Sequence, residues 1–232
     1  NWGSLAYSQS AFLPILQVSS LFGTAGVVFL LALPASAVSL AIHALRSPGR
    51  PIPWYHLAVA FLLPVLAAGW GHFRLARAHP SPVLPIGLAA IDDAIGIEAK
   101  PNYIQNIRRH YEALTSQLAA AGAQVILLPE KIAVSSQSRT PEWHQFFGSL
   151  AARHQVWLIA GLTTETPQGF ANQAWTYNPA GERVNLYQKR ALAPPERSTY
   201  IAGERAAIFS VAGIPAGVAI CKDLHFARIG QD

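Results

Sequence analysis

Residues Gly217–Phe226 read GVAICKDLHF, an apolar run that ends where charged and polar residues begin, and Cys221 stands at that junction. Cys221 is the only cysteine among the 232 residues. A thiol in this place can lie at the end of a buried strand with its sulfur facing a pocket. A lone cysteine in an apolar run is more often a small core residue, because free cysteine is among the most buried residue types. A reactive thiol therefore has to be argued from other residues.

The composition is too apolar for an ordinary soluble domain, with 51% hydrophobic and 12% charged residues. The first 91 residues carry four of the 17 basic residues and none of the 12 acids. The net charge of +5 is thus typical of membrane-flanking charge, and we do not expect nucleic-acid binding. One cysteine excludes an intramolecular disulfide framework, and eight histidines without an HExxH pattern predict neither a metal site nor another cofactor.

Residues 1–80 are predicted to form a membrane region. Residues 24–45 contain no charge and, as a helix, would reach about 33 Å, enough to cross a hydrocarbon core. Pro34 predicts a kink in this span. A second span is predicted over 53–72, and residues 1–22 are typical of a loop or interfacial segment. Charge alone leaves the orientation open, because Arg46 and Arg50 in one loop are balanced by Arg74 and Arg77 beyond the second span.

Residues 81–232 have the composition of a soluble α/β domain. Strands are predicted at 83–91, 124–130 and 156–162, and amphipathic helices at 101–121 and 141–153. A hairpin is predicted around the turn PAGE at 179–182, and two further strands, AAIFSV and AGVAIC, around 213–215. Strand, helix, strand, helix and then successive strands favour a layered α/β domain.

Three polar residues stand at the ends of apolar strands: Glu130 in ILLPEK, Lys189 in LYQKRAL and Cys221. Taken singly, each is more often a solvated strand end, one cation of a basic hairpin or a core residue. Together they form a usable catalytic set, because a thiol needs a base to become a thiolate. A nearby ammonium favours the thiolate and stabilises an oxyanion.

These three residues, in this order and spacing, resemble the nitrilase (carbon-nitrogen hydrolase) superfamily. The resemblance implies Glu130 as the general base, Lys189 as the catalytic lysine and Cys221 as the nucleophile. Glu196 in APPERSTY would be a supporting glutamate, and the backbone amide of Lys222 would be an oxyanion donor. The implied fold is an α-β-β-α sandwich preceded by transmembrane helices. The sandwich would be incomplete, because the sequence ends 11 residues after Cys221, and we expect a fragment of a larger protein.

The segment GSLAYSQSAFLPILQVSSLFGTAGVVFLLAL at 3–33 resembles the membrane segment of the apolipoprotein N-acyltransferase branch. This resemblance implies a multi-pass enzyme of the bacterial inner membrane with its catalytic domain on the periplasmic side. Its acyl donor would be a phospholipid and its acceptor an apolipoprotein.

Two other functions stay open. The residues after the thiol, CKD at 221–223, look more like other carbon-nitrogen hydrolases than like the acyltransferase branch, which favours a membrane-tethered amidase or nitrilase with the same Glu-Lys-Cys triad. The other open interpretation is a non-enzymatic membrane scaffold with a degenerate α/β domain. It is the weakest, because all three catalytic residue types are present.

Overall fold

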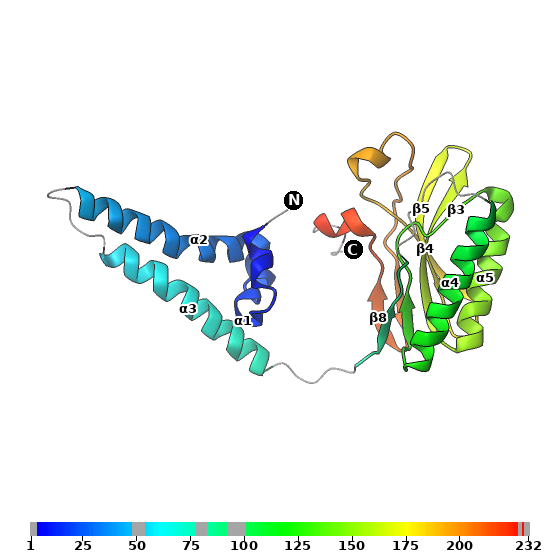
Figure 1. Cartoon of the computed structure of the whole chain (residues 1–232), viewed down its shortest axis with the longest axis horizontal. Helices are drawn as coiled ribbons and strands as arrows, with labels where there is room; N and C mark the ends of the chain where they lie inside the picture. Colours follow the sequence, from blue (N-terminus) through cyan, green and yellow to red (C-terminus); the bar gives the residue numbers. More distant parts are fainter. Residues whose placement is uncertain (1–3, 48–53, 78–82, 92–100, 227–228, 230–232) are drawn as a thin grey trace. The chain divides into compact units, whose positions relative to one another are not determined.

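The structure is a computed structural model that describes residues 4–47, 54–77, 83–91, 101–226 and 229. The predicted loop with Arg50 and residues 78–82 of the proline-rich linker lie outside these residues. The chain divides into two compact units, residues 1–82 and 83–232, which are described separately (Figure 1).

The first unit is helical. Its elements are the 3-10 helix η1 (Leu5–Gln9), α1 (Leu13–Leu16), α2 (Ser19–Arg46) and α3 (Trp54–Ala76). Helices α2 and α3 have 28 and 23 residues and are long and apolar enough to cross a membrane. Many of their large apolar side chains are exposed, including Phe29 on α2 and Leu62 on α3. Such a surface is costly in water and suits contact with lipid or with other apolar helices.

The predicted spans differ from these helices at their ends, and α2 has a break at Gly23 that was not predicted. Helix α2 begins five residues before the predicted span 24–45, and α3 continues four residues past 72. Backbone angles inside α2 leave the helical region at Gly23, with φ 62° and ψ −165°. Pro34, the predicted kink, lies inside the helix. A glycine adopts this conformation without a steric penalty, which is why the break falls there.

The second unit is built on a mixed sheet. Its strands are β1 (Ile86–Leu88), β2 (Val125–Leu127), β3 (Val134–Ser135), β4 (Trp157–Thr166), β5 (Gly169–Tyr177) and β6 (Arg183–Gln188). Among the described residues the strand order is β1-β2-β4-β5-β6, and β3 also pairs with β4. Strands β1 to β4 pair in parallel, whereas β5 and β6 are antiparallel to their neighbours. Strand β1 is shorter than the predicted strand 83–91.

Two amphipathic helices cover one face of this sheet (Figure 1). Helix α4 (Pro101–Ala120) presents apolar residues three and four apart, as predicted, and buries Ile107 and Tyr111. Helix α5 (Thr140–His154) follows the 3-10 helix η2 (Gln137–Arg139) and buries Trp143 and Phe147. These side chains pack against Leu158, Trp175 and other strand residues in the largest core of the unit.

The opposite face of the sheet packs against the last part of the described chain. Ala207 and Ile220 form a small core with Ala174 of β5 and Tyr187 of β6. In the sequence, the hairpin of β7 (Ile208–Val211) and β8 (Ile214–Gly217) lies between Ala207 and Ile220. The remaining 3-10 helices are η3 (Pro194–Glu196) and η4 (Cys221–His225). The arrangement of helices, sheet and a second strand layer matches the predicted mixed α/β architecture.

The prediction that AGVAIC forms a strand up to Cys221 is wrong in its boundaries. Strand β8 ends at Gly217, and Cys221 opens η4. The cause is the turn before β8: Ala212 and Gly213 both have positive φ, 51° and 81°, and so place Ile214 opposite Val211. Two consecutive residues with positive φ form the tight turn that suits a hairpin, so the strand begins earlier than its apolar residues suggest.

Gly161 of β4 lets the strand pass very close to the chain segment that follows β2. A Cβ atom at Gly161 would lie 2.3 Å from the Pro129 carbonyl oxygen and 2.6 Å from the Cα of Glu130. Both distances are shorter than any real Cβ contact, so a side chain here would displace the backbone of Glu130.

We expect Gly161→Ala to lower the free energy of unfolding by about 1–3 kcal/mol, the usual cost of overpacking. Urea denaturation in mild detergent, followed by tryptophan fluorescence, measures this change. Gly217→Ala is the matched control, because its Cβ would meet only the Ala207 carbonyl oxygen at 3.6 Å, an ordinary contact. Equal unfolding midpoints for the two variants would contradict the close approach.

Candidate active site

Glu130 and Lys189 are delivered by the ends of two sheet strands. Glu130 comes three residues after β2, and Lys189 directly follows β6. The Lys189 side chain is almost completely buried, and its Nζ lies 2.9 Å from Oε1 of Glu130. Burying an ammonium is unfavourable unless it is paired and hydrogen-bonded, so this contact is a strong structural constraint.

Glu196 is the second carboxylate that contacts Lys189. It ends η3, is buried at 7% exposure, and its Oε2 lies 2.9 Å from Lys189 Nζ. The same oxygen accepts a hydrogen bond of 2.8 Å from the backbone amide of Ala193. The structure thus brings together Glu130, Lys189 and Glu196, three of the residues predicted for the site.

Two residues that the sequence did not single out complete this polar cluster. Asn172 of β5, fully buried, donates through Nδ2 to Oε1 of Glu130 and, at 3.3 Å, to Oε1 of Glu196. Lys131 forms an ion pair with Oε1 of Glu196. The clue to Asn172 was a polar side chain between apolar residues in the strand sequence ANQAW, where Gln173 is a second amide, and the clue to Lys131 was its place next to Glu130. Neither clue identifies a partner, because the partners lie on other elements.

The charges of the cluster shift the pKa values of its members. Burial opposes ionisation of Glu196, but hydrogen bonds from Lys131, Lys189 and the Ala193 amide outweigh it and lower the pKa of Glu196 to about 2. For Lys189, burial alone would lower the pKa. The hydrogen bonds to Glu196 and Glu130 outweigh burial and raise this pKa above its ordinary value. Both residues are therefore held in their charged forms around neutral pH.

Cys221 faces the same pocket as Glu130. A pocket of about 320 Å³ is lined by these two residues and by apolar residues of β2, β4 and the segment 217–220, among them Leu127, Ile159 and Val218. Cys221 is exposed and has a positive φ of 47°. A non-glycine residue in this conformation costs about 1–3 kcal/mol and is held by the structure around it. Exposure makes the thiol accessible, in contrast to a cysteine that fills a core.

Lys222 follows Cys221 in η4 and is half-buried. The predicted role of its backbone amide as an oxyanion donor stays a prediction. The same holds for the catalytic roles of Glu130, Lys189, Cys221 and Glu196. What the arrangement offers is a carboxylate next to a buried ammonium, on one wall of a pocket that also contains an exposed thiol. These are the groups that nucleophilic acyl chemistry requires.

The lowered pKa of Glu196 predicts a stability change in acid. The folded pKa is about 2 and the ordinary value is 4.5, so the contribution of Glu196 to stability is present above pH 4.5. It is lost as the pH falls from about 4.5 towards 2, because the unfolded chain then binds the proton more readily. We expect Glu196→Gln to unfold more easily at neutral pH and to lose less stability on acidification than the unchanged protein.

Urea midpoints in detergent across this pH range measure the effect. Glu165→Gln, which removes an exposed carboxylate of β4, is the control for a general loss of charge. If Glu196→Gln and Glu165→Gln showed the same acid dependence, the ion-pair cluster would not have the strength that its geometry indicates.

Residues 89–229, more than half of the chain, match the protein family described as carbon-nitrogen hydrolase. The chain is also 28% identical over 204 residues to apolipoprotein N-acyltransferase from Geobacter metallireducens. That match covers 83% of this chain and 38% of the relative, so the chain spans well under half of the relative's length.

Solved structures of an amidase from Nesterenkonia sp. AN1 have a similar fold. One has a TM-score of 0.55 and 21% identity and covers 63% of this chain and 60% of its own. Another, a variant with acrylamide added at its active-site cysteine, has a TM-score of 0.54 and 19% identity, with 63% and 61% covered. This amidase is a member of the nitrilase superfamily.

The predicted nitrilase-like fold is confirmed by these structures, and the predicted family by the match over residues 89–229. The relationship predicted with the apolipoprotein N-acyltransferases is also confirmed by the identity to the Geobacter protein. The chain therefore belongs to the carbon-nitrogen hydrolase family.

Proposed function

We propose that this protein is an N-acyltransferase. It moves an acyl chain from a phospholipid, through a thioester on Cys221, to the N-terminal amine of a lipoprotein. The observation that carries the proposal is the buried Lys189, held between Glu130 and Glu196 beside a pocket that Glu130 shares with Cys221. Similarity to the Geobacter apolipoprotein N-acyltransferase favours this reaction among those of the family.

In the first half-reaction, Glu130 takes the thiol proton and the sulfur of Cys221 attacks the carbonyl carbon of the phospholipid ester. The negative charge that develops on the carbonyl oxygen is stabilised by the Lys189 ammonium and by the backbone amide of Lys222. The carbon-oxygen ester bond then breaks, and the proton held by Glu130 passes to the alkoxide of the departing lysophospholipid. The acyl chain remains on Cys221 as a thioester.

In the second half-reaction, the α-amine of the lipoprotein attacks the thioester carbonyl. Glu130 now accepts a proton from the attacking amine, and Lys189 again stabilises the oxyanion. The carbon-sulfur bond breaks, the amide product leaves, and Glu130 gives the proton from the amine to the Cys221 thiolate, which becomes a thiol again. Glu196, Lys131 and Asn172 contact no reacting atom in this scheme, but they hold Lys189 and Glu130 in place.

The proposed setting is a bilayer, with residues 1–80 as the membrane region and 81–232 as part of the catalytic domain. Helices α2 and α3 have the length and apolar surface for this role. Both substrates carry lipid chains, so an enzyme that receives them laterally from a membrane is physically reasonable. By the resemblance to the acyltransferases, the membrane is the bacterial inner membrane, the enzyme is multi-pass and its catalytic domain lies on the periplasmic side.

The second candidate is a membrane-tethered amidase in which water resolves the acyl-enzyme. One observation favours it: Lys222 and Asp223 follow Cys221, as in other carbon-nitrogen hydrolases. Solved structures of an amidase share the fold, which is compatible with either candidate. The two candidates share the first covalent step and differ in the acyl donor and in the acceptor.

The test is intact-protein mass spectrometry of the protein, at the full length the cell makes, in detergent with a diacyl phospholipid and no amine. We expect Cys221 to gain the mass of one acyl chain, and hydroxylamine to remove it as a thioester. Adding a diacylglyceryl-modified peptide with a free α-amine should discharge the enzyme and yield the N-acylated peptide.

Cys221→Ala must abolish the adduct, and Glu130→Gln should slow its formation by at least about 100-fold, the typical contribution of a general base. Acyl transfer by Cys221→Ala would overturn the proposal. An unmodified Cys221 with phospholipid, together with hydrolysis of small amides, would establish the amidase instead.

A further inference from the structure

Asp223, two residues after the candidate nucleophile, is completely buried and accepts four hydrogen bonds. Its Oδ2 accepts from the Tyr187 hydroxyl at 2.6 Å and from the Ile220 amide at 2.9 Å. Its Oδ1 accepts from the amides of Arg190 at 3.2 Å and Ala191 at 2.7 Å. A buried carboxylate with both oxygens satisfied in this way is a rigid junction, because each donor that is lost leaves the buried charge less well stabilised.

The four donors come from two separate parts of the chain. The Ile220 amide belongs to the residue just before Cys221, so one bond closes the turn that carries the thiol. The other three come from β6 and the residues directly after it: Tyr187, Arg190 and Ala191. Lys189 lies between these donors. The Asp223 carboxylate therefore joins the cysteine turn to the segment that carries the candidate catalytic lysine.

The Lys189 end of this junction is itself fixed to the sheet. The Lys189 amide donates to the Asn172 carbonyl of β5 at 2.8 Å, and its carbonyl accepts from the Gly203 amide at 2.8 Å. The cysteine end has less support of its own: β8 ends at Gly217, and Cys221 is exposed with a positive φ of 47°. A strained, exposed residue keeps such a conformation only if neighbouring contacts impose it.

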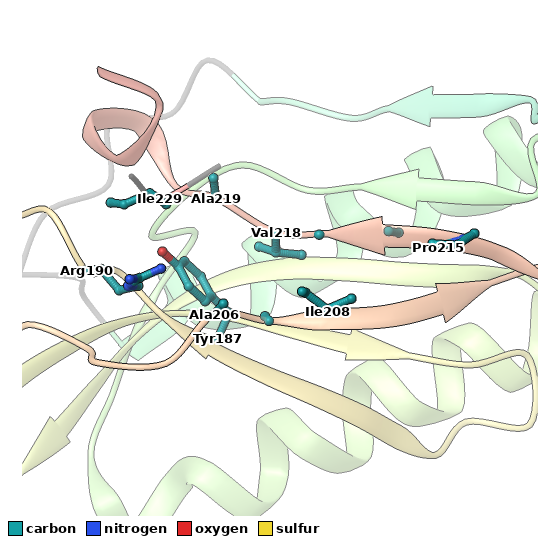
Figure 2. A pocket seen from close by; sticks show the side chains of 11 residues that line it. Tyr187, Arg190, Ala206, Ile208, Pro215, Val218, Ala219 and Ile229 are labelled. Carbon is teal, nitrogen blue, oxygen red and sulfur yellow. The ribbon is translucent and has the colours of Figure 1, made fainter. Parts of the chain in front are cut away.

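The Tyr187 side chain supplies one of the four hydrogen bonds to Asp223. Figure 2 shows it beside Arg190 in a pocket whose other wall includes Val218 and Ala219, the residues that lead to the Cys221 turn. Tyr187 is buried at 1% exposure, and burial together with the hydrogen bond to Asp223 raises its pKa. The hydroxyl therefore keeps its proton and remains a donor to Asp223 around neutral pH.

We propose that Asp223 is a positioning residue: its carboxylate holds the Cys221 turn against the Lys189 segment, so that the thiol faces Glu130 and Lys189. The inference rests on the proposed function for the identity of the nucleophile. Within the sequence CKD at 221–223, Asp223 is thus the residue that holds Cys221 in position.

Two other roles for Asp223 give different results. If Asp223 acted mainly through its negative charge, its removal would make the nearby thiolate easier to form and would speed thiol alkylation at neutral pH. If it served only the stability of the fold, its removal would leave the alkylation of folded protein unchanged. Positioning predicts slower alkylation, because a displaced thiol loses the base and the ammonium that favour the thiolate.

The experiment measures the rate of Cys221 alkylation by iodoacetamide at pH 7, in detergent and well below the unfolding temperature. For Asp223→Asn we expect a rate lower by about tenfold or more. Acyl-enzyme formation from phospholipid should fall in its maximal rate more than in the phospholipid concentration at half-maximal rate, because the lipid site is unchanged.

Tyr187→Phe keeps the charge of Asp223 and removes one of its four hydrogen bonds, so it decides the question even if Asp223→Asn does not fold. We expect a smaller decrease in the alkylation rate, about two- to fivefold, in the same direction. Tyr177→Phe is the matched control: Tyr177 is also fully buried, but its hydroxyl contacts Nδ1 of His144 on the helical side of the sheet, at 2.9 Å. This variant should alkylate at the unchanged rate.

Alkylation of both Asp223→Asn and Tyr187→Phe at or above the unchanged rate would overturn the positioning role. So would an equal decrease for Tyr177→Phe, which would indicate a general loss of stability. The alkylation readout needs no acyl donor, so it also separates this inference from the proposed function. Slower alkylation in a protein that forms no acyl-enzyme would retain the positioning role and reject the acyltransferase.

Discussion

The buried ammonium of Lys189 is the constraint on which the rest of this α/β unit depends. An unpaired charge in a protein interior costs several kcal/mol, so the chain must bring carboxylates to it. Both Glu130 and Glu196 do so. Glu130 follows β2 and Glu196 ends η3, elements that are far apart in the sequence. The meeting of these elements thus follows from the need to satisfy one cation as much as from the packing of the core.

The apolar core determines where that meeting takes place. Helices α4 and α5 bury their apolar stripes on one face of the sheet, which fixes the strands and their register. The C-terminal ends of β2 and β6 then lie at the same end of the sheet, because the two strands run in the same direction. Gly161 of β4 allows the Glu130 segment to lie directly on that strand. The rigid sheet and the ion-pair cluster at its strand ends together give Glu130 and Lys189 the precise placement that catalytic groups need.

Much of the fold could be predicted from the sequence, because the signals are local. Periodic apolar residues indicate α4, and PAGE indicates the turn between β5 and β6. Within the site, Glu130, Lys189 and Glu196 followed from their family resemblance. Asn172, Lys131 and Asp223 were missed, because their contacts join different elements and sequence spacing does not record them. The end of β8 was misplaced for a related reason: the turn at Ala212 and Gly213, not the apolar run, sets the strand.

Charge balance links the cluster to the proposed chemistry. Two glutamates and two lysines, Glu130, Glu196, Lys131 and Lys189, carry no net charge together. When Glu130 takes a proton from Cys221, one negative charge moves from the carboxylate to the sulfur. The summed charge of the four residues and Cys221 is unchanged. Lys189 then loses one of its two anionic partners and can interact with the next negative charge to form, on the sulfur or on the carbonyl oxygen. Glu196, paired also with Lys131 and the Ala193 amide, stays ionised and keeps Lys189 in place through each step.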